Sequence, residues 1–511
     1  MLSSEASSER ISQPSASFSH LLSRSALWTA LLVGLLLSAS FFPLWLAPRH
    51  ATMRNDDTYI TLTYARSLAE GEGWRFNGGP VTLGTTTPLF AMTVAGLAWL
   101  MPRVPMEYLA VGLSTLCWLA TGWLFFLGRR SFGLSAGAAT LVALAALLQG
   151  GWWPGSLGME ATFLLFGVTL ATWLVARGSP LAAGLVSGLL FLIRPEGLGM
   201  VPLAAAWLVW QQPKAWREVL PRFLLGAALP LGLWAVYAWS TFGSVLPNSV
   251  SAKMGQGTGW PGQPFAVRLV GEWLPPIVER YGLSPVLSLI WPLAALGLVY
   301  AARRARPIFL LVAWTALYVL AYAVLHAPGY WWYIFPALFT LQLLAGLGLV
   351  PLLEQRQRWA RALGVVALLL FLGISFHRST LTLSADPSDH RAPTYLAIAK
   401  WLRENTAPGS TVAFVEIGYL GYFTENRVID LVGLVEPEFT ENAAHLDLAS
   451  NFWRAEPDYL LYHTAFDWLM SGIVYDERFE QRYEAIMTFS GDLPVPITLF
   501  QRRDLASPTR P

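Results

Sequence analysis

The hydrophobic residues of this chain form long, nearly uninterrupted runs up to about residue 380 and short, scattered runs after it. A run of about 20 apolar residues is long enough to cross the hydrocarbon core of a bilayer as a helix. The stretch 88–101, of about fourteen residues, is too short and indicates an interfacial or re-entrant segment. The pattern therefore predicts about eleven spans, at residues 26–47, 107–127, 133–150, 160–176, 180–194, 197–210, 223–242, 284–301, 307–326, 331–350 and 360–376.

The remaining segments divide the chain into three parts. Residues 1–24 are rich in Ser and poor in apolar residues, which predicts a disordered cytoplasmic tail. Residues 25–379 hold the spans and a first outer loop, 48–106. Residues 380–511 have the composition of a soluble α/β domain, with a predicted helix at 392–405 and predicted strands at 411–415, 427–431, 459–463 and 496–500.

Composition agrees with a membrane protein that crosses the bilayer many times. Hydrophobic residues make up 54% of the chain and charged residues only 13%, whereas soluble domains carry roughly 25% charged residues. The net charge of +2 predicts no basic surface for nucleic acid, so nucleic acid is not an expected partner. The single cysteine, Cys117, excludes an internal disulfide and a cysteine-rich metal site.

Basic residues between the spans predict the orientation of the chain. Under the positive-inside rule, the loops that hold Arg129-Arg130, Lys214 to Arg222, Arg303 to Arg306 and Arg356 to Arg361 are cytoplasmic. The first outer loop, the turn near residue 195, the loop 243–283 and the C-terminal domain are then extracytoplasmic. We therefore expect a multi-pass protein of the inner (cytoplasmic) membrane.

The first outer loop begins with adjacent carboxylates, Asp56 and Asp57, at the head of a short amphipathic helix in which Ile60, Tyr64 and Leu68 share one face. Two interpretations remain open from these residues. The acids, with Asn55, cap the helix and favour its dipole. Alternatively they are reactive groups, and their proximity raises the pKa of one carboxyl toward that of a base that works at neutral pH.

A transferase on the extracytoplasmic face has no nucleotide there, so it needs a donor activated in the membrane, such as a polyprenyl-phosphate sugar. That reaction calls for a carboxylate base and for cations at the departing phosphate. Arg194 and Lys253 are the candidate cations, although a snorkelling arginine and a solvated lysine are the ordinary alternatives. Glu160, His326 and Tyr330 are further candidates; a span N-terminus, a span end and an aromatic belt explain them equally well.

Four ordered motifs carry a family resemblance. They are residues 55–77, Gly158 to Thr162, Arg194-Pro195-Glu196-Gly197, and Phe242 to Lys253, with tail pieces at 417–422 and 428–434. Together they resemble the GT-C glycosyltransferases, above all the branch that contains the terminal arabinofuranosyltransferase of mycobacterial cell walls. Aminoarabinose transferases and protein O-mannosyltransferases are more distantly similar.

The resemblance implies a polyprenyl-phosphate-sugar-dependent glycosyltransferase with a GT-C transmembrane domain. It implies that Asp56 is the base, that Asp57 is a second acid beside it, and that Arg194 binds the donor phosphate. From the placement of charges, we expect Asp57 to orient the acceptor or assist a cation and Lys253 to act with Arg194 at the leaving phosphate. Its motifs also place Glu160, Tyr59, Asn248 and Glu196 among the substrate-binding residues, beside His326 and Tyr330. Membrane lipid surrounds the spans, and the acceptor is an envelope glycan, lipid or protein. After Asn77 the family has two acids that are missing in Gly78 to Thr86, which affects the expected sugar.

Two other classes of function and one cofactor question stay open. Interrupted spans around Arg194 are also typical of a transporter or flippase for a lipid-linked substrate. A third interpretation is a sensor or assembly protein whose exported tail binds carbohydrate. Asp56 and Asp57 could bind Mg²⁺ or Mn²⁺, but two carboxylates do not specify a metal site, and no cofactor is required by the sequence.

Overall fold

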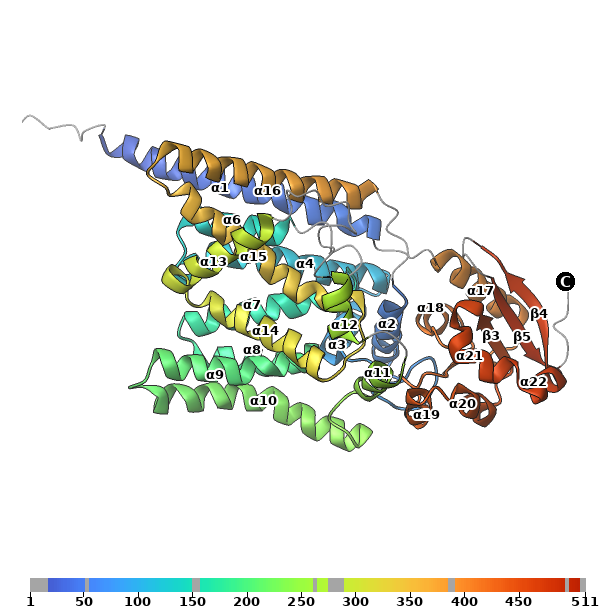
Figure 1. Ribbon diagram of the computed structural model, residues 1–511. Coiled ribbons are helices and arrows are strands. Elements are labelled where there is room, and N and C mark those ends of the chain that lie inside the picture. Colours follow the sequence, from blue (N-terminus) through green and yellow to red (C-terminus); the bar gives the residue numbers. More distant parts are fainter. Residues whose placement is uncertain are drawn as a thin grey trace, which may run out of the picture.

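The computed structural model describes residues 17–50, 55–148, 157–260, 264–273, 289–384, 391–491 and 496–505. Its helices form a bundle of roughly parallel and antiparallel rods, and a domain with a β-sheet lies beyond one end of that bundle (Figure 1). Residues 1–16 of the predicted disordered tail lie outside the described residues, and helix α1 begins at Ser17, within the 1–24 segment.

Each of the eleven predicted spans coincides with a helix in the described part of the chain. Within the described ranges, five helices are long and apolar enough to cross a membrane by length and composition, and shorter apolar helices lie among them. The bundle helices are α1 (Ser17–Leu46), α4 (Met106–Leu127), α6 (Ala136–Leu147), α7 (Ala161–Ala176), α8 (Pro180–Ile193), α9 (Met200–Gln211), α10 (Trp216–Phe242), α13 (Ile290–Arg304), α14 (Ile308–Val324), α15 (Phe335–Leu353) and α16 (Arg358–Ser384), with α5 (Arg129–Phe132) in one connection.

Glycines allow two helix pairs of the bundle to pack with their backbones in contact. A Cβ atom on Gly184 of α8 would lie 2.0 Å from the carbonyl oxygen of Phe223 on α10. A Cβ atom on Gly297 of α13 would lie 1.8 Å from the carbonyl oxygen of Leu344 on α15. Small residues favour such contacts in membranes, where close van der Waals packing replaces the hydrophobic effect between helices.

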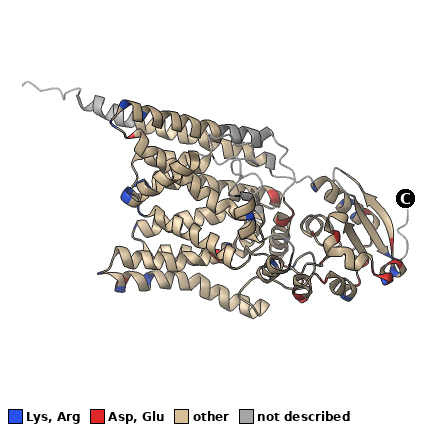
Figure 2. Ribbon diagram, viewed as in Figure 1, with Lys and Arg blue, Asp and Glu red and all other residues tan. Residues whose placement is uncertain are grey.

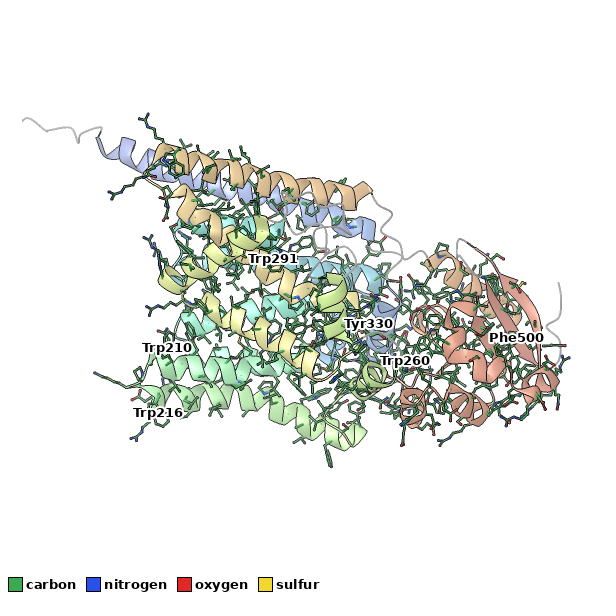
Figure 3. The ribbon with its side chains drawn as sticks, in the orientation of Figure 1. Trp210, Trp216, Trp260, Trp291, Tyr330 and Phe500 are labelled. Atoms are coloured by element: carbon green, nitrogen blue, oxygen red, sulfur yellow. The ribbon has the colours of Figure 1, made fainter. Side chains whose placement is uncertain are left out.

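The two ends of the bundle differ in charge. Lys and Arg gather at the end that points away from the sheet domain (Figure 2). The last turn of α13 supplies Arg303 and Arg304 there, and α5 supplies Arg129 and Arg130. Trp210 and Trp216 lie at the same end (Figure 3). The basic segments that the sequence assigns to cytoplasmic loops therefore share one end of the bundle.

Short helices fill the space between the bundle and the sheet domain (Figure 1). The apolar stretch that was left out of the predicted spans is one of them, α3, which packs beside α2. These elements are α2 (Asp56–Ala69), α3 (Pro88–Leu100), α11 (Asn248–Gly259), α12 (Phe265–Arg268) and the helical turns at Ala47–His50, Pro195–Gly199, Leu269–Trp273 and Trp331–Ile334.

The C-terminal domain has a five-stranded sheet with the order β2-β1-β3-β5-β4. β1 is parallel to β2 and β3, whereas β5 is antiparallel to β3 and β4. All four predicted strands are present, and β4 was missed. As the outer strand it is exposed at most positions and lacks the alternation that marks a half-buried strand. The strands are β1 (Thr411–Phe414), β2 (Arg427–Asp430), β3 (Tyr459–His463), β4 (Tyr483–Phe489) and β5 (Ile497–Arg502).

Helices cover this sheet, and the predicted helix at 392–405 is among them as α17. One side of the domain has a hydrophobic core of its own, which includes Phe452 and Leu460. On the other side, Tyr395 and Tyr419 belong to one continuous cluster with Tyr59 of α2. The helices are α17 (Ala392–Asn405), α18 (Gly418–Phe423), α19 (Thr440–Ala444), α20 (Leu448–Ala455), α21 (Asp467–Val474) and α22 (Glu477–Arg482), with 3-10 turns at Pro437–Phe439 and Thr464–Phe466.

Candidate active site

Asp56 lies at the junction of α2 with the C-terminal domain, and only 5% of its surface is exposed. Its two carboxylate oxygens accept the backbone N–H groups of Gly418, at 2.9 Å, and Tyr419, at 2.8 Å. Position 418 has to be Gly, because a Cβ atom there would lie 1.9 Å from the backbone oxygen of Asp56. Asp56 therefore caps the first turn of α18, not its own helix.

Burial raises the pKa of Asp56 to about 7, and the negative charge of Glu416 adds to that rise. The two backbone N–H groups act in the opposite direction, because they stabilise the carboxylate. The sequence predicted a raised pKa for one of the paired acids. The main cause is burial, followed by an acid of the C-terminal domain, and not the neighbouring Asp57.

Asp57 is the more open of the two acids, with 27% of its side chain exposed. Its carboxylate lies 3.4 Å from the ammonium nitrogen of Lys253 on α11. The same ammonium lies over the rings of Tyr330 and Tyr333, at 5.4 and 5.9 Å from their centroids. Burial alone would lower the pKa of Lys253, but interactions with Tyr333 and Asp57 outweigh it and raise that pKa, so Lys253 is charged at neutral pH.

Arg194 forms a closed ionic cluster with two acids. It follows the last residue of α8, is buried, and pairs with Glu160 before α7 and with Glu196 in the turn Pro195–Gly199. Its third nitrogen donates to the hydroxyl of Tyr322, at 2.9 Å, and that hydroxyl donates to Glu196 at 2.8 Å. Two carboxylates neutralise the guanidinium, so Arg194 offers little free charge to a further anion.

Two cavities meet at Asp57. The larger one holds about 460 Å³ and lies between α2, α11 and the C-terminal domain. The smaller one, of about 30 Å³, is lined by Asp57, Glu160, Arg194 and Lys253 together with Thr85 to Thr87. Those threonines belong to the segment that lacks the two acids of the family pattern. Asp57, Ile60, Trp332 and Leu434 line both cavities.

Within the described residues, Glu196 and three other predicted substrate residues line neither of these cavities. Tyr59 packs against Tyr419 at a ring distance of 4.7 Å. The Asn248 side-chain amide donates to the backbone oxygen of Gly433, at 2.7 Å, and so ties α11 to the C-terminal domain. His326 is exposed and has a positive φ of 51° in the turn after α14.

Tyr330 does line the larger cavity. Its ring is stacked on Trp332, with centroids 4.7 Å apart and planes inclined by 4°, and its hydroxyl donates to Gln256 at 2.9 Å. Figure 3 places Tyr330 at the junction of the bundle and the C-terminal domain.

Sequence reasoning missed the charged residues that the C-terminal domain adds to the larger cavity, Arg391 and Glu416, which form an ion pair. Arg268 of α12 lines the cavity from the other side and donates to the backbone oxygen of Gly329 at 2.5 Å. The only signal for Glu416 was its place directly before the family-like piece 417–422. That piece docks on α2, where Arg66 donates to the backbone oxygen of Tyr422 at 2.8 Å.

The arrangement does not fit a divalent cation held by both acids. Both carboxylate oxygens of Asp56 accept hydrogen bonds from backbone N–H groups, and the ammonium of Lys253 lies beside Asp57. The described residues contain no group of three His, Cys, Asp or Glu side chains placed as metal ligands. Mg²⁺ is usually bound through one or two carboxylates together with waters and substrate phosphates, so of the two acids only Asp57 remains as a candidate ligand.

Comparison with solved structures identifies the fold. The structure of ArnT from Cupriavidus metallidurans bound to undecaprenyl phosphate aligns over 94% of this chain and 99% of its own, with a TM-score of 0.58 and 14% identity. The apo oligosaccharyltransferase of Archaeoglobus fulgidus aligns over 94% of this chain and 75% of its own, with a TM-score of 0.60 and 13% identity. Both are GT-C glycosyltransferases. This chain has the GT-C fold.

A third GT-C structure, archaeal AglB from Archaeoglobus fulgidus with an inhibitory peptide and a dolichol-phosphate, aligns over 90% of this chain and 73% of its own, with a TM-score of 0.56 and 12% identity. Residues 386–507 match a domain family described as a domain of unknown function, DUF8728. A search of curated proteins gave no match. The GT-C fold and the C-terminal sheet domain confirm the predicted fold class.

Proposed function

We propose that this protein is a membrane glycosyltransferase that transfers a sugar from a polyprenyl-phosphate donor to an acceptor hydroxyl on the extracytoplasmic face. The observation that carries the proposal is the position of Asp57 where the two cavities meet. One cavity is lined by Lys253, whose ammonium suits a phosphate, and the other is large enough for an acceptor. A transferase needs a base at that meeting point.

The smaller cavity supports the donor end of the proposal. Lys253 has one loosely placed carboxylate partner, whereas Arg194 is neutralised by two. We therefore assign the donor phosphate chiefly to Lys253 and give Arg194 the role of holding Glu160 and the end of α8 in place. A further cavity, of about 20 Å³, is lined by Arg194 and by apolar residues of α7 and α15 such as Leu164 and Phe335, so apolar surface adjoins the proposed phosphate end.

The geometry favours Asp57 over Asp56 as the base. Asp57 would take the proton from the acceptor hydroxyl, and the acceptor oxygen would attack the anomeric carbon of the donor. The bond between that carbon and the phosphate oxygen then breaks, and the polyprenyl phosphate leaves beside Lys253. Asp56, whose oxygens are engaged by the backbone, fastens the C-terminal domain to α2. This reverses the roles that the family resemblance implies for the two acids.

The finer features of the proposal rest on the sequence motifs and the charge pattern. The resemblance of residues 55–77 to the arabinofuranosyltransferase branch makes a polyprenyl-phosphate arabinofuranose the first donor to test, with an envelope glycan, lipid or protein as acceptor. The basic end of the bundle is the cytoplasmic end in this proposal, and the site and the C-terminal domain face outward from an inner membrane (Figure 2).

The test is release of polyprenyl phosphate from a panel of synthetic polyprenyl-phosphate sugars by the purified protein in lipid, with cell-envelope extract as acceptor. We expect release with one sugar and a loss of roughly 10²- to 10⁴-fold in Asp57→Asn, the range for removal of a general base. Glu70→Gln, an exposed acid at the other end of the same helix, is the matched control and should retain wild-type activity.

Two results would contradict the proposal. Full activity in a folded Asp57→Asn protein would remove the assigned base. Movement of an intact lipid-linked sugar across the bilayer, without release of polyprenyl phosphate from any donor, would favour the transporter interpretation. Thermal unfolding of each variant shows whether a loss of activity reflects a loss of folding.

A further inference from the structure

The C-terminal domain supplies an aromatic wall to the larger cavity. Trp468, on α21, lines this cavity, and 44% of its surface is exposed, so its ring is accessible to a ligand there. Its ring meets the ring of Trp260 edge to face, with centroids 5.3 Å apart. The indole nitrogen of Trp260 donates to the backbone oxygen of Ala443 at 3.0 Å, so the C-terminal domain holds this ring in place.

A second aromatic pair, Tyr330 stacked on Trp332, lines the same cavity from the bundle side. In Figure 3, Trp260 and Tyr330 both lie where the bundle meets the C-terminal domain. Charged groups line the space as well, namely the Arg391–Glu416 ion pair and Arg268. The cavity thus combines aromatic rings with groups that form charge-assisted hydrogen bonds.

This combination matches the chemistry of a saccharide. A sugar ring presents C–H faces that pack on aromatic rings and hydroxyls that hydrogen-bond to carboxylates and guanidinium groups. The volume of about 460 Å³ lies within the range of small-molecule sites, roughly 300–1,000 Å³. One or two sugar residues can therefore enter, with the rest of a longer glycan outside.

A peptide acceptor fits this wall less well. Extended peptides commonly bind by adding a strand to a free sheet edge. Strand β2 is an outer strand of the sheet, but Asn77 of the first loop already accepts its Val428 N–H group, at 2.9 Å. An acyl chain fits less well too, because it would remove Glu416 and Arg391 from water without replacing their hydrogen bonds.

We propose that this aromatic wall is the acceptor subsite and that the acceptor is a saccharide, with Trp468 as its stacking platform. The proposal rests on the glycosyltransferase function proposed above, because it places the acceptor in the larger cavity and the donor phosphate in the smaller one, which Lys253 lines. It also gives the C-terminal domain a specific role, which is to bring the glycan to the first outer loop.

Binding in the absence of any donor tests the proposal. The full chain in lipid nanodiscs is titrated by calorimetry with defined hexasaccharides of arabinose, galactose, glucose and mannose, and with hexapeptides. We expect at least one saccharide to bind, and Trp468→Ala to weaken that binding roughly tenfold or more, as for an aromatic anchor. Tyr475→Ala is the matched control, because Tyr475 follows the same helix, is 71% exposed and does not line the cavity.

The subsite proposal is overturned if no saccharide binds, if Trp468→Ala binds the saccharide as well as wild type does, or if hexapeptides bind instead and depend on Trp468. Donor cleavage is measured separately, so the two proposals fail independently. Saccharide binding that depends on Trp468, without release of polyprenyl phosphate, would refute the transferase and leave a carbohydrate-binding wall. Release of polyprenyl phosphate with no saccharide binding would support the transferase and refute the saccharide subsite.

Discussion

Two ionic clusters lie near each other at the same end of the bundle and differ in how completely they are neutralised. Arg194 is buried between Glu160 and Glu196 and bonded to Tyr322. Among the residues that the structure describes, Lys253 has a single carboxylate partner, at 3.4 Å, and that partner, Asp57, borders the larger cavity. A closed cluster holds helices together, whereas an open one keeps charge available for a substrate.

The difference follows from where the partners come from. Glu160 and Glu196 are fixed to helix ends of the bundle, so the bundle supplies both counter-charges of Arg194. Lys253 lies on α11, outside the bundle; its carboxylate partner comes from the head of α2, and its other contacts are the rings of Tyr330 and Tyr333. Desolvation of a buried cation is costly unless it is fully paired, which explains the closed cluster. Lys253 is compensated more weakly, as suits a group that exchanges partners.

The largest expected effect comes from opening the closed cluster. Arg194→Gln leaves two buried carboxylates without their cation, and removing one partner of a buried ion pair costs about 3–5 kcal/mol. We expect a large fall in the midpoint of thermal unfolding in detergent, or no folded protein at all. Arg177→Gln, an exposed arginine after α7, should unfold within a degree or two of wild type, roughly 0.5 kcal/mol or less. An equally stable Arg194→Gln protein would contradict the distinction between the clusters.

A smaller effect is expected from the open cluster, and it falls on function. Lys253→Gln should keep its folded state but raise the KM for the polyprenyl-phosphate donor by roughly 10- to 100-fold, as for loss of one charge-assisted contact to phosphate, about 1.5–3 kcal/mol. Lys253→Arg keeps the charge and should recover most of the affinity. A KM unchanged in Lys253→Gln, with only stability lost, would assign Lys253 to structure.

The smallest expected effect is a change in folding stability with pH, and it depends on Asp56. The folded protein holds a proton on Asp56 up to about pH 7, whereas the unfolded chain releases it near 3.8. The stability that this proton contributes is therefore lost as pH rises through 7, and wild type should lose roughly 1 kcal/mol between pH 6 and 8.

Asp56→Asn cannot titrate and should lose less stability than wild type over this interval. The measurement is the difference in unfolding midpoint between the two proteins at pH 6 and pH 8, which cancels the titration of shared groups such as Asp430. A parallel pH dependence of the two midpoints would show that Asp56 does not take up this proton on folding.

The sequence by itself determined the helical spans, the C-terminal strands β1, β2, β3 and β5 and the place of the acids at the head of α2. These features depend on local patterns, namely the length of apolar runs, their period and the charges beside them. The sequence did not predict β4, because an exposed outer strand has no such pattern. The sequence also singled out Glu160, Arg194 and Lys253 as candidates, and the structure brings these three residues to one small cavity.

Only the tertiary structure decided what the individual residues do. Asp56 and Asp57 are neighbours with the same chemistry, yet one meets the backbone at Gly418 and the other meets Lys253. Asn248 donates a hydrogen bond to the backbone oxygen of Gly433 and does not line a cavity described above. These contacts join segments up to hundreds of residues apart, and burial, pKa and pairing depend on which distant groups arrive. No local pattern contains that information, because the fold alone brings the C-terminal domain onto the first outer loop.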